Sequence, residues 1–185
     1  MHLTIKEQDK IKKQILDFTI RGVEHFLSEN PDLAFYAFAY DCNAEYAEVS
    51  LCFNTEAEFQ KTLKQYQTSK YSAEYKSGQD VKELKYNTGD WEYQCFDTLY
   101  VFTEDELNKI FSEQPEDNYK SWSLFVRELL VLFTESIIEF TKTETYAKIP
   151  KTKDFLVFCI NHDEDFEDAI KRLKEYKEEH LSPNK

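Results

Sequence analysis

Residues 119–143 constrain the fold of this chain more than any other segment. Their apolar side chains cover more of a helical surface than a single stripe, at Trp122, Phe125, Val126, Leu129, Leu130, Leu132, Phe133, Ile137, Ile138 and Phe140. A helix that is apolar over so much of its surface must pack against neighbours on two sides. We therefore expect a long helix at the centre of the core.

The N-terminal segments predict a helix followed by a β-hairpin. From Ile5 to Leu27, apolar residues recur at helical spacing with charges between them, and Pro31 ends this pattern. Two aromatic-rich runs, 33–41 and 46–53, then flank a short polar turn and predict paired strands. Strict alternation places Phe35, Ala37 and Ala39 on one face of the first strand and Tyr36, Phe38 and Tyr40 on the other. Because both sets are apolar, we expect both faces to be covered.

Helix-start signals mark two further helices. Asn54-Thr55-Glu56 can cap free amides and predicts a helix to about Gln67. Thr103-Glu104-Asp105-Glu106 has capping-box spacing and predicts a helix toward Phe111, which Gln114-Pro115-Glu116-Asp117 ends. Residues 69–80 are polar and favour a loop, whereas 82–93 favour neither helix nor strand.

The C-terminal part predicts one more strand and one more helix. The run 155–160 is short and apolar, and 163–179 is a charged segment with an apolar helical face. Helices and strands do not alternate regularly, and a length of 185 residues suits one core. We therefore expect an α+β fold in a single domain, residues 1–185, with a small, mainly antiparallel sheet packed against several helices.

The charge balance narrows the range of partners. Lys and Arg total 23 against 36 Asp and Glu, which gives a net charge of −13. Phosphate backbones and anionic lipid surfaces repel such a chain, so we expect neither nucleic acid nor membrane as a partner. No apolar stretch of signal-peptide or membrane-spanning length is present, and we expect a cytoplasmic location.

Motifs of common enzyme classes do not occur in the sequence. It has no G-x-S-x-G, G-x-x-x-x-G-K-[ST] or H-E-x-x-H pattern, and its three glycines are too few for a phosphate-binding loop. Cys42, Cys52, Cys95 and Cys159 are scattered in apolar or aromatic surroundings. We expect buried thiols with no catalytic or metal role, and no cofactor, although Cys42 and Cys52 could face each other across the hairpin.

Two stretches that lack Lys and Arg suggest a protein-binding surface. Between Gly22 and Gln60, and again between Tyr86 and Asn108, acidic residues are interspersed with tyrosine and tryptophan. If the two stretches meet in space, the acids speed encounter with a basic protein and the rings supply contact energy. The residues predicted to bind such a partner are Tyr40, Glu45, Tyr46, Glu48, Asp90, Trp91, Glu92 and Tyr93.

A second function stays open on the sequence alone. The tract Asn161-His162-Asp163-Glu164-Asp165 follows a buried strand, where His162, Asp163 and Asp165 could hold a divalent cation in a small metal-dependent hydrolase. The same carboxylates also suit the start of a helix, because they complement its dipole. The tract lacks the glycine and distal glutamate of a calcium loop, so the helix start is the favoured interpretation.

The sequence contains three short motifs, namely Pro31-Asp-Leu-Ala-Phe-Tyr-Ala-Phe38, Phe53-Asn-Thr-Glu56 and Lys85-Tyr-x-x-x-Asp90-Trp-x-Tyr93. Together they resemble a bacterial family of small acidic domains of unknown function. The resemblance implies an α+β fold, a bacterial cytosol and neighbouring polymorphic-toxin and immunity genes, with no established activity. The matching positions of the second motif are Asn54, Thr55 and Glu56, which can equally form a helix cap. Those of the third are Asp90, Trp91 and Tyr93, where the indole can equally be packed in the core. We therefore expect a non-enzymatic module, an immunity-type protein that neutralises a basic toxin.

Overall fold

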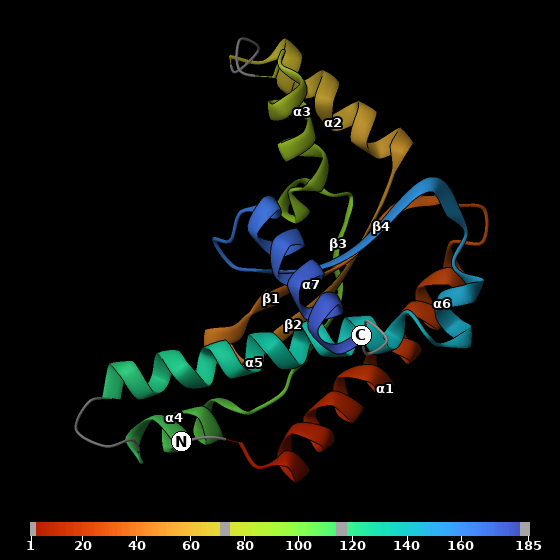
Figure 1. Ribbon diagram of the computed structural model, residues 1–185. Coiled ribbons are helices and arrows are strands. Elements are labelled where there is room, and N and C mark those ends of the chain that lie inside the picture. The colour runs from red at the N-terminus through yellow and green to blue at the C-terminus, as the bar shows by residue number, and fades with distance from the viewer. Residues whose placement is uncertain (1–2, 71–74, 114–117, 182–185) are drawn as a thin grey trace.

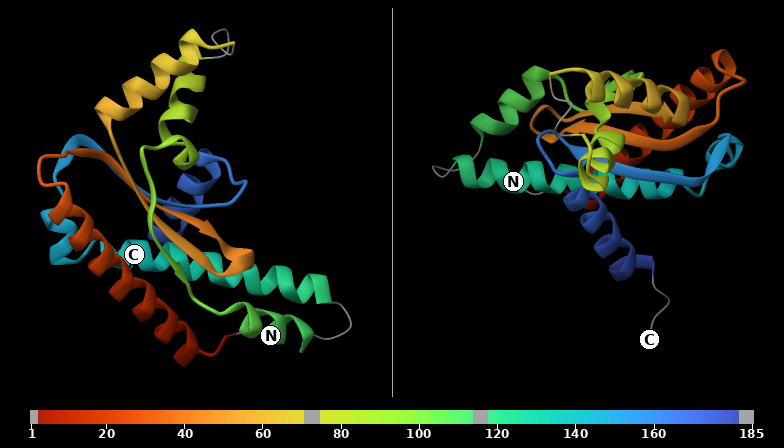
Figure 2. Two further views of the ribbon diagram at one scale, coloured as in Figure 1. Left: turned by 180° about the vertical axis from the view of Figure 1, so that it is seen from behind. Right: turned by 90° about the horizontal axis from the view of Figure 1, so that it is seen from above.

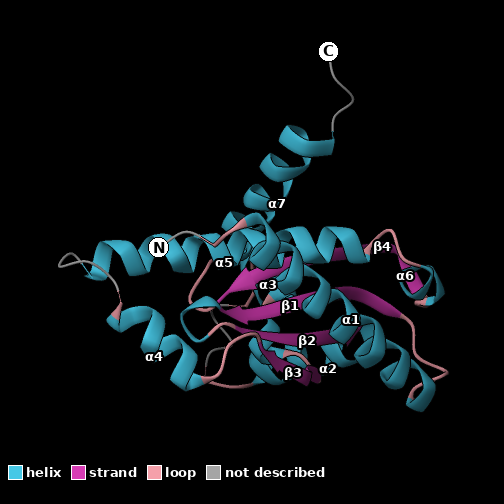
Figure 3. Cartoon of the chain, turned by 90° about the horizontal axis from the view of Figure 1, so that it is seen from below, coloured by secondary structure: helices cyan, strands magenta, loops and turns pink. Residues whose placement is uncertain are grey.

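The computed structural model describes residues 3–70, 75–113 and 118–181. Its strands form one four-stranded sheet in the order β3-β2-β1-β4 (Figures 1 and 3). They are β1 (Phe35–Asn43), β2 (Glu48–Thr55), β3 (Tyr93–Tyr100) and β4 (Lys151–Asn161). β1 and β2 form the expected antiparallel hairpin, β3 is antiparallel to β2, and β4 is parallel to β1. The expected α+β fold with a mainly antiparallel sheet is confirmed.

Helices cover the sheet and extend beyond its ends. They are α1 (Ile5–Glu29), α2 (Glu56–Thr68), α3 (Gly78–Tyr86), α4 (Glu104–Ser112), α5 (Asn118–Phe140), α6 (Glu144–Lys148) and α7 (Phe166–Leu181), with short 3-10 turns η1 (Ala44–Tyr46) and η2 (Thr88–Asp90). α1 and α5 pack against each other and the sheet, and α7 packs on β4. α2 and α3 project together from one end of the sheet, whereas α4 lies at the other end, beside the start of α5 (Figures 1 and 2). In the described part of the chain, no helix is both long enough and apolar enough to cross a bilayer.

The helix predicted at residues 119–143 is α5, and it is the central core helix. Phe125, Leu129, Phe133 and Ile137 are fully buried. α5 packs against α1 and also against β1 and β4, which confirms the predicted packing on two sides. Its outer surface remains open to solvent, where Tyr119 is 82% exposed.

Threonine side chains start helices where the sequence predicts them. Thr55 accepts a hydrogen bond from the Glu58 amide at the start of α2. Thr103 and Glu106 form the predicted capping box at α4, and α1 begins with the same motif. Each cap satisfies backbone groups that a helix end leaves unpaired, so these helix starts are determined by local sequence.

Two elements differ from the sequence prediction. The region predicted as a loop or left undecided contains α3, which begins at Gly78 after a cap by Ser77. The region that follows it contains β3, an edge strand that exposes polar residues such as Gln94 and Asp97 and therefore shows little hydrophobic pattern. The predicted helix break at 114–117 lies outside the described residues, as do residues 71–74 of the predicted loop.

The predicted alternation along the first strand is wrong at its start. Phe35 packs on Phe26 of α1, whereas Tyr36 contacts Phe59 of α2 on the opposite face. Phe38, predicted to lie opposite Phe35, is on the α1 and α5 side with it. A shift in pairing register just after Phe35 interrupts the two-residue period and exchanges its face. The expectation that both faces are covered is nevertheless confirmed, since the residues from Phe35 to Tyr40 are all buried.

Phe53 lies at the centre of a cluster of rings between the hairpin and α1. Its ring centroid is 4.4 Å from that of Phe35, 4.7 Å from Phe38 and 5.5 Å from Phe96. Phe26 of α1 adds a stacked contact at 5.4 Å. Ring pairs at such separations contribute about 0.5–1.5 kcal/mol each beyond the burial of their area. This cluster therefore joins β1, β2 and β3 to α1.

Replacing Phe53 by alanine should destabilise the protein strongly. The change removes a fully buried ring and leaves a cavity, so we expect the free energy of unfolding to fall by about 3–5 kcal/mol. Val131→Ala, at a side chain of α5 that is 39% exposed, is the control and should change this free energy by less than about 0.5 kcal/mol. Urea denaturation followed by circular dichroism measures both. A loss below about 1 kcal/mol for Phe53→Ala would contradict the packing described here.

Candidate functional site

Two of the residues predicted to bind a partner lie in the core. Tyr40 is fully buried, and its hydroxyl is 2.5 Å from Thr19 Oγ1 of α1. Trp91 is 2% exposed, and its indole N–H donates to the Lys85 carbonyl at 2.9 Å. Both side chains serve the fold, so neither offers its ring to a partner in this conformation.

The first group of predicted residues lies at the turn of the hairpin. The two stretches that lack Lys and Arg do meet, because β2 and β3 pair antiparallel. Their register places Glu48 opposite Tyr100, and Glu45 and Tyr46 lie in the η1 turn just before β2. These acidic and aromatic side chains therefore come from both stretches and gather at one end of the sheet.

The second group lies at the other end of β3, about 20 Å away along the strand. It consists of Asp90, Glu92 and Tyr93. Asp90 accepts hydrogen bonds from the Tyr66 hydroxyl at 2.7 Å and from the Asn87 side chain at 2.6 Å, so internal contacts engage its carboxylate. The acidic surface that the sequence predicts as one field is thus divided into two groups.

A groove of about 770 Å³ opens beside the first group, and we call it the hairpin-end groove. Its walls are mostly apolar, formed by Tyr46, Tyr100, Phe102, Leu107, Phe111 and Trp122. The charged residues that line it are Glu45 and Glu104. Tyr46 is 61% exposed and Tyr100 is 59% exposed, so both rings are available to solvent. The sequence predicts Glu45 and Tyr46, and Tyr100 lies in the second stretch that lacks Lys and Arg. The prediction misses the apolar walls that α4 and α5 supply, because the groove forms only where η1, β3, α4 and α5 meet.

Local backbone contacts hold the rim of this groove. Ala47 follows η1 and has a left-handed φ of 50°, and the Val101 N–H donates to the Ala47 carbonyl at 2.8 Å. The Thr103 cap then starts α4 two residues after Val101. The hairpin turn and the start of α4 are consequently fixed relative to each other.

A second cavity of about 670 Å³ lies between α3 and the loop from β4 to α7. Carboxylates dominate its lining, among them Asp80, Glu83, Asp90, Asp163, Asp165 and Asp168. Asp80 and Asp168 stand in the first turns of α3 and α7, where negative charge complements the helix dipole. Lys82 and Glu167 also form an ion pair from α3 to α7 at 3.2 Å. These structural roles account for Asp80, Glu167 and Asp168, and we assign no function to this cavity.

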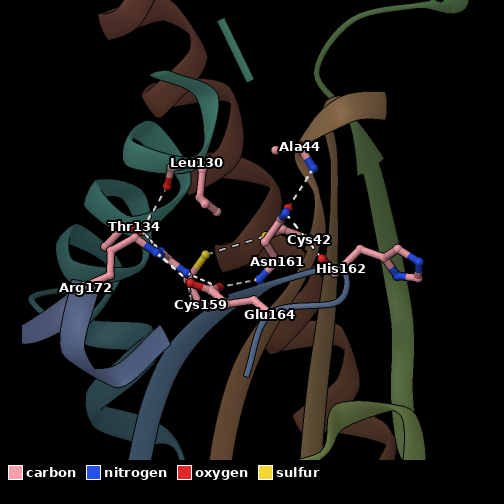
Figure 4. Close-up of polar contacts among 9 residues, drawn as sticks. All are labelled: Cys42, Ala44, Leu130, Thr134, Cys159, Asn161, His162, Glu164 and Arg172. Carbon is pink, nitrogen blue, oxygen red and sulfur yellow. Dashed lines mark hydrogen bonds and ion pairs between the residues drawn. The ribbon is translucent and has the colours of Figure 1, made fainter. Parts of the chain in front are cut away.

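Arg172 ties the 161–165 tract into the fold (Figure 4). Its guanidinium donates to the two carboxylate oxygens of Glu164 at 2.5 and 3.2 Å. It also donates to the Cys159 carbonyl at 3.0 Å and to Thr134 Oγ1 of α5. The backbone N–H of Asn161 donates to the same Glu164 carboxylate at 2.9 Å. The tract therefore anchors the start of α7 to β4 and α5.

The alternative metal site in this tract gains no support from the geometry. The side chain of His162 is 68% exposed and that of Asp163 is 90% exposed. Figure 4 shows His162 pointing away from the Arg172 cluster. His162 Nε2 and Asp163 Oδ2 are 3.7 Å apart, but within the described residues the three donor groups whose ligand atoms all lie within 4.8 Å of one another are Asp41, Cys52 and Cys95, and not His162, Asp163 and Asp165.

Replacing Arg172 with methionine should destabilise the protein by leaving the Glu164 carboxylate without its cation. The Glu164 side chain is only 17% exposed, so we expect the free energy of unfolding to fall by about 3 kcal/mol. The double variant Arg172→Met, Glu164→Gln removes both charges and should recover at least about 1 kcal/mol of that loss. Urea denaturation measures both variants and Glu164→Gln alone. Losses of the two single variants that simply add in the double variant would contradict the coupling of the two side chains.

The cysteines form two pairs that their positions in the sequence do not reveal. The sulfurs of Cys42 and Cys159 are 3.6 Å apart, and both residues are buried. The idea that Cys42 faces Cys52 across the hairpin is wrong, because the register places Cys42 opposite Val49. Cys52 instead lies beside Cys95. The backbone N–H of Cys95 donates to the Cys52 sulfur at 3.1 Å. Cys95 is exposed, and the expectation that it is buried is also wrong.

Cys95 should be the reactive thiol of the native protein. Hydrogen bonds with the Cys52 and Ser50 side chains lower the pKa of Cys95 to about 7, whereas the contact with Cys95 and burial raise the pKa of Cys52. Iodoacetamide should therefore modify Cys95 first, at a rate that rises with pH through about 7 as the thiolate forms. Cys159 is buried and should react only after unfolding. Mass spectrometry of the modified peptides gives both rates, and faster modification of Cys159 would refute this prediction.

The family comparison covers most of the described fold. A family model with the description "Domain of unknown function (DUF4303)" matches residues 15–175, from within α1 to within α7. No curated protein and no solved structure matches the chain. The match includes all four strands and all the residues that line the hairpin-end groove. The chain therefore belongs to the DUF4303 family of domains of unknown function.

Proposed function

We propose that this chain is a non-enzymatic protein-binding module, an immunity-type protein that neutralises a basic toxin by docking it in the hairpin-end groove. One observation carries the proposal: two largely exposed tyrosines, Tyr46 and Tyr100, stand over an apolar groove whose charged lining residues are acidic. The toxin and immunity neighbourhood that the sequence resemblance implies supports the choice of partner. A bacterial cytosol is the matching location.

The groove offers the surface that an interface hot spot requires. Tyrosine and tryptophan dominate binding energies, because they bury a large area and lose little conformational entropy. Trp122 packs on Phe111 at 5.5 Å and on Phe125 at 5.4 Å between ring centroids, so its position is set before a partner arrives. A partner side chain can thus bury itself against a preformed wall, and the cost of ordering that wall on binding is small.

Charge favours a basic occupant of this groove. Glu45 and Glu104 line it, Glu48 lies opposite Tyr100, and Asp105 follows Glu104 in the first turn of α4. The described lining of the groove contains no Lys or Arg. The net charge of −13 adds attraction at longer range. A basic protein is therefore attracted both during its approach and at the contact surface.

The second acidic group lies just outside the expected contact area. A standard interface buries about 800 Å² on each partner, which corresponds to a patch about 30 Å across, or about 15 Å from its centre to its edge. Asp90, Glu92 and Tyr93 lie about 20 Å from the turn end of β3, beyond the edge of a patch centred on the groove. Charges outside the contact area act mainly on the association rate, so this group would contribute to encounter more than to affinity.

Coexpression tests the proposal. Proteins encoded beside the gene for this chain are produced in a bacterial host with and without the chain, and we expect a basic neighbour that is toxic alone and tolerated in its presence. The double variant Tyr46→Ala, Tyr100→Ala should weaken binding of that neighbour by at least about 30-fold, since loss of hot-spot rings costs about 2 kcal/mol or more. Isothermal calorimetry measures the affinity, and toxicity should return with the variant.

Tyr119→Ala is the matched control for these substitutions. This tyrosine is 82% exposed on α5 and does not line the groove, so its loss should change the affinity by less than about 2-fold. Equal binding by the double variant would contradict docking in the groove. Failure to neutralise any neighbour would contradict the immunity role itself.

A further inference from the structure

Asp41, Cys52 and Cys95 bring three metal-binding groups together on one face of the sheet. A carboxylate oxygen and two sulfurs from these residues all lie within 4.8 Å of one another. Two thiols and a carboxylate form a donor set that suits Zn²⁺. We propose that these side chains bind a zinc ion, at a site distinct from the hairpin-end groove and independent of the proposed function.

Three adjacent strands supply one ligand each. Cys52 of β2 is opposite Ala39 of β1, and Asp41 lies two residues further along β1, so the two side chains point to the same face. The β2–β3 pairing shifts register at Cys52, and Cys95 of β3 has a left-handed φ of 45°. This conformation is costly for a residue other than glycine, and such strain is concentrated at functional positions. Its effect here is to set Cys95 beside Cys52.

The spacing of the donors is close to that of a filled site. Zinc binds sulfur at about 2.3 Å, so two sulfurs in a tetrahedral site are about 3.8 Å apart. Donor atoms that already lie within 4.8 Å need inward shifts of at most about 1 Å to reach such geometry. Cys95 is exposed, and its side chain has room for a shift of this size.

Neighbouring hydroxyl groups hold the ligands in place. Thr88 Oγ1 donates to Asp41 Oδ2 at 2.8 Å, which orients the carboxylate. Thr88 is itself buried in η2. On the same face, Ser50 and Thr98 are hydrogen-bonded through their hydroxyls at 2.8 Å, and Ser50 also contacts Cys95. Contacts of this kind fix the ligands of metal sites and tune their affinity.

Burial makes the ionised forms of the ligands costly in the absence of a cation. It raises the pKa of the Asp41 carboxyl, although the hydrogen bond from Thr88 and the nearby His162 lower that pKa. The contact with Cys95, together with burial, raises the pKa of Cys52 as well. A divalent cation would stabilise the ionised forms of all three ligands at once. Because Cys95 faces solvent, a fourth position would remain open to water, as in zinc sites with three protein ligands.

Titration of the reduced, metal-free protein with Zn²⁺ against a competing chelating dye tests the proposal. We expect one Zn²⁺ per chain for the unaltered protein. Cys95→Ser and Asp41→Asn should each lower the affinity by at least about 100-fold, since loss of a ligand exceeds the effect of its supporting contacts. Cys159→Ala removes a thiol outside the cluster and should bind zinc as the unaltered protein does.

Two further readouts separate a metal site from a fault in folding. Bound Zn²⁺ should slow the modification of Cys95 by iodoacetamide at least about tenfold, because a coordinated thiolate is a poor nucleophile. Thr88→Ala leaves the three ligands in place and should weaken binding by about 10–100-fold, with circular dichroism unchanged. Failure of the reduced protein to bind zinc, or an unchanged affinity in Cys95→Ser, would overturn the proposal.

Discussion

Burial of the β1–β2 hairpin on both faces is the constraint on which the rest of the structure depends. On one face, Phe35 and Phe53 pack with Phe26 of α1, and α5 completes the cover. On the other face, Tyr36 meets the rings of α2 and α3. The hairpin must therefore be central in the sheet, which leaves β3 and β4 as its edges. Its turn is thereby held at the end of the sheet where the hairpin-end groove opens.

The elements that the sequence predicts are those with a strong local or periodic signal. Threonine caps start α2 and α4, and the broad apolar surface of α5 makes it the core helix, as expected. β3 escapes prediction because an edge strand with Gln94 and Asp97 exposed carries little alternation. The face of Phe35 is predicted wrongly, because a bulge changes the period within a strand without any distinctive residue.

The candidate sites depend still more on pairing between distant segments. Glu45 and Tyr46 are predicted as partner-binding residues, but Leu107 and Trp122 join them only through the packing of α4 and α5. Tyr40 and Trp91 have the same aromatic-acidic surroundings in sequence, yet both are buried. The cluster of Asp41, Cys52 and Cys95 is similarly invisible, because its members come from three strands and no ligand spacing links them.

The central claim is that a basic partner docks at the turn end of the hairpin rather than in the acidic cavity. Hydrogen–deuterium exchange of this chain, with and without the neutralised neighbour, locates the contact directly. The account predicts slower exchange at residues 44–47 and 100–107, which form the rim of the groove. Protection confined to 80–90 and 163–168 would place the partner in the acidic cavity and contradict the account.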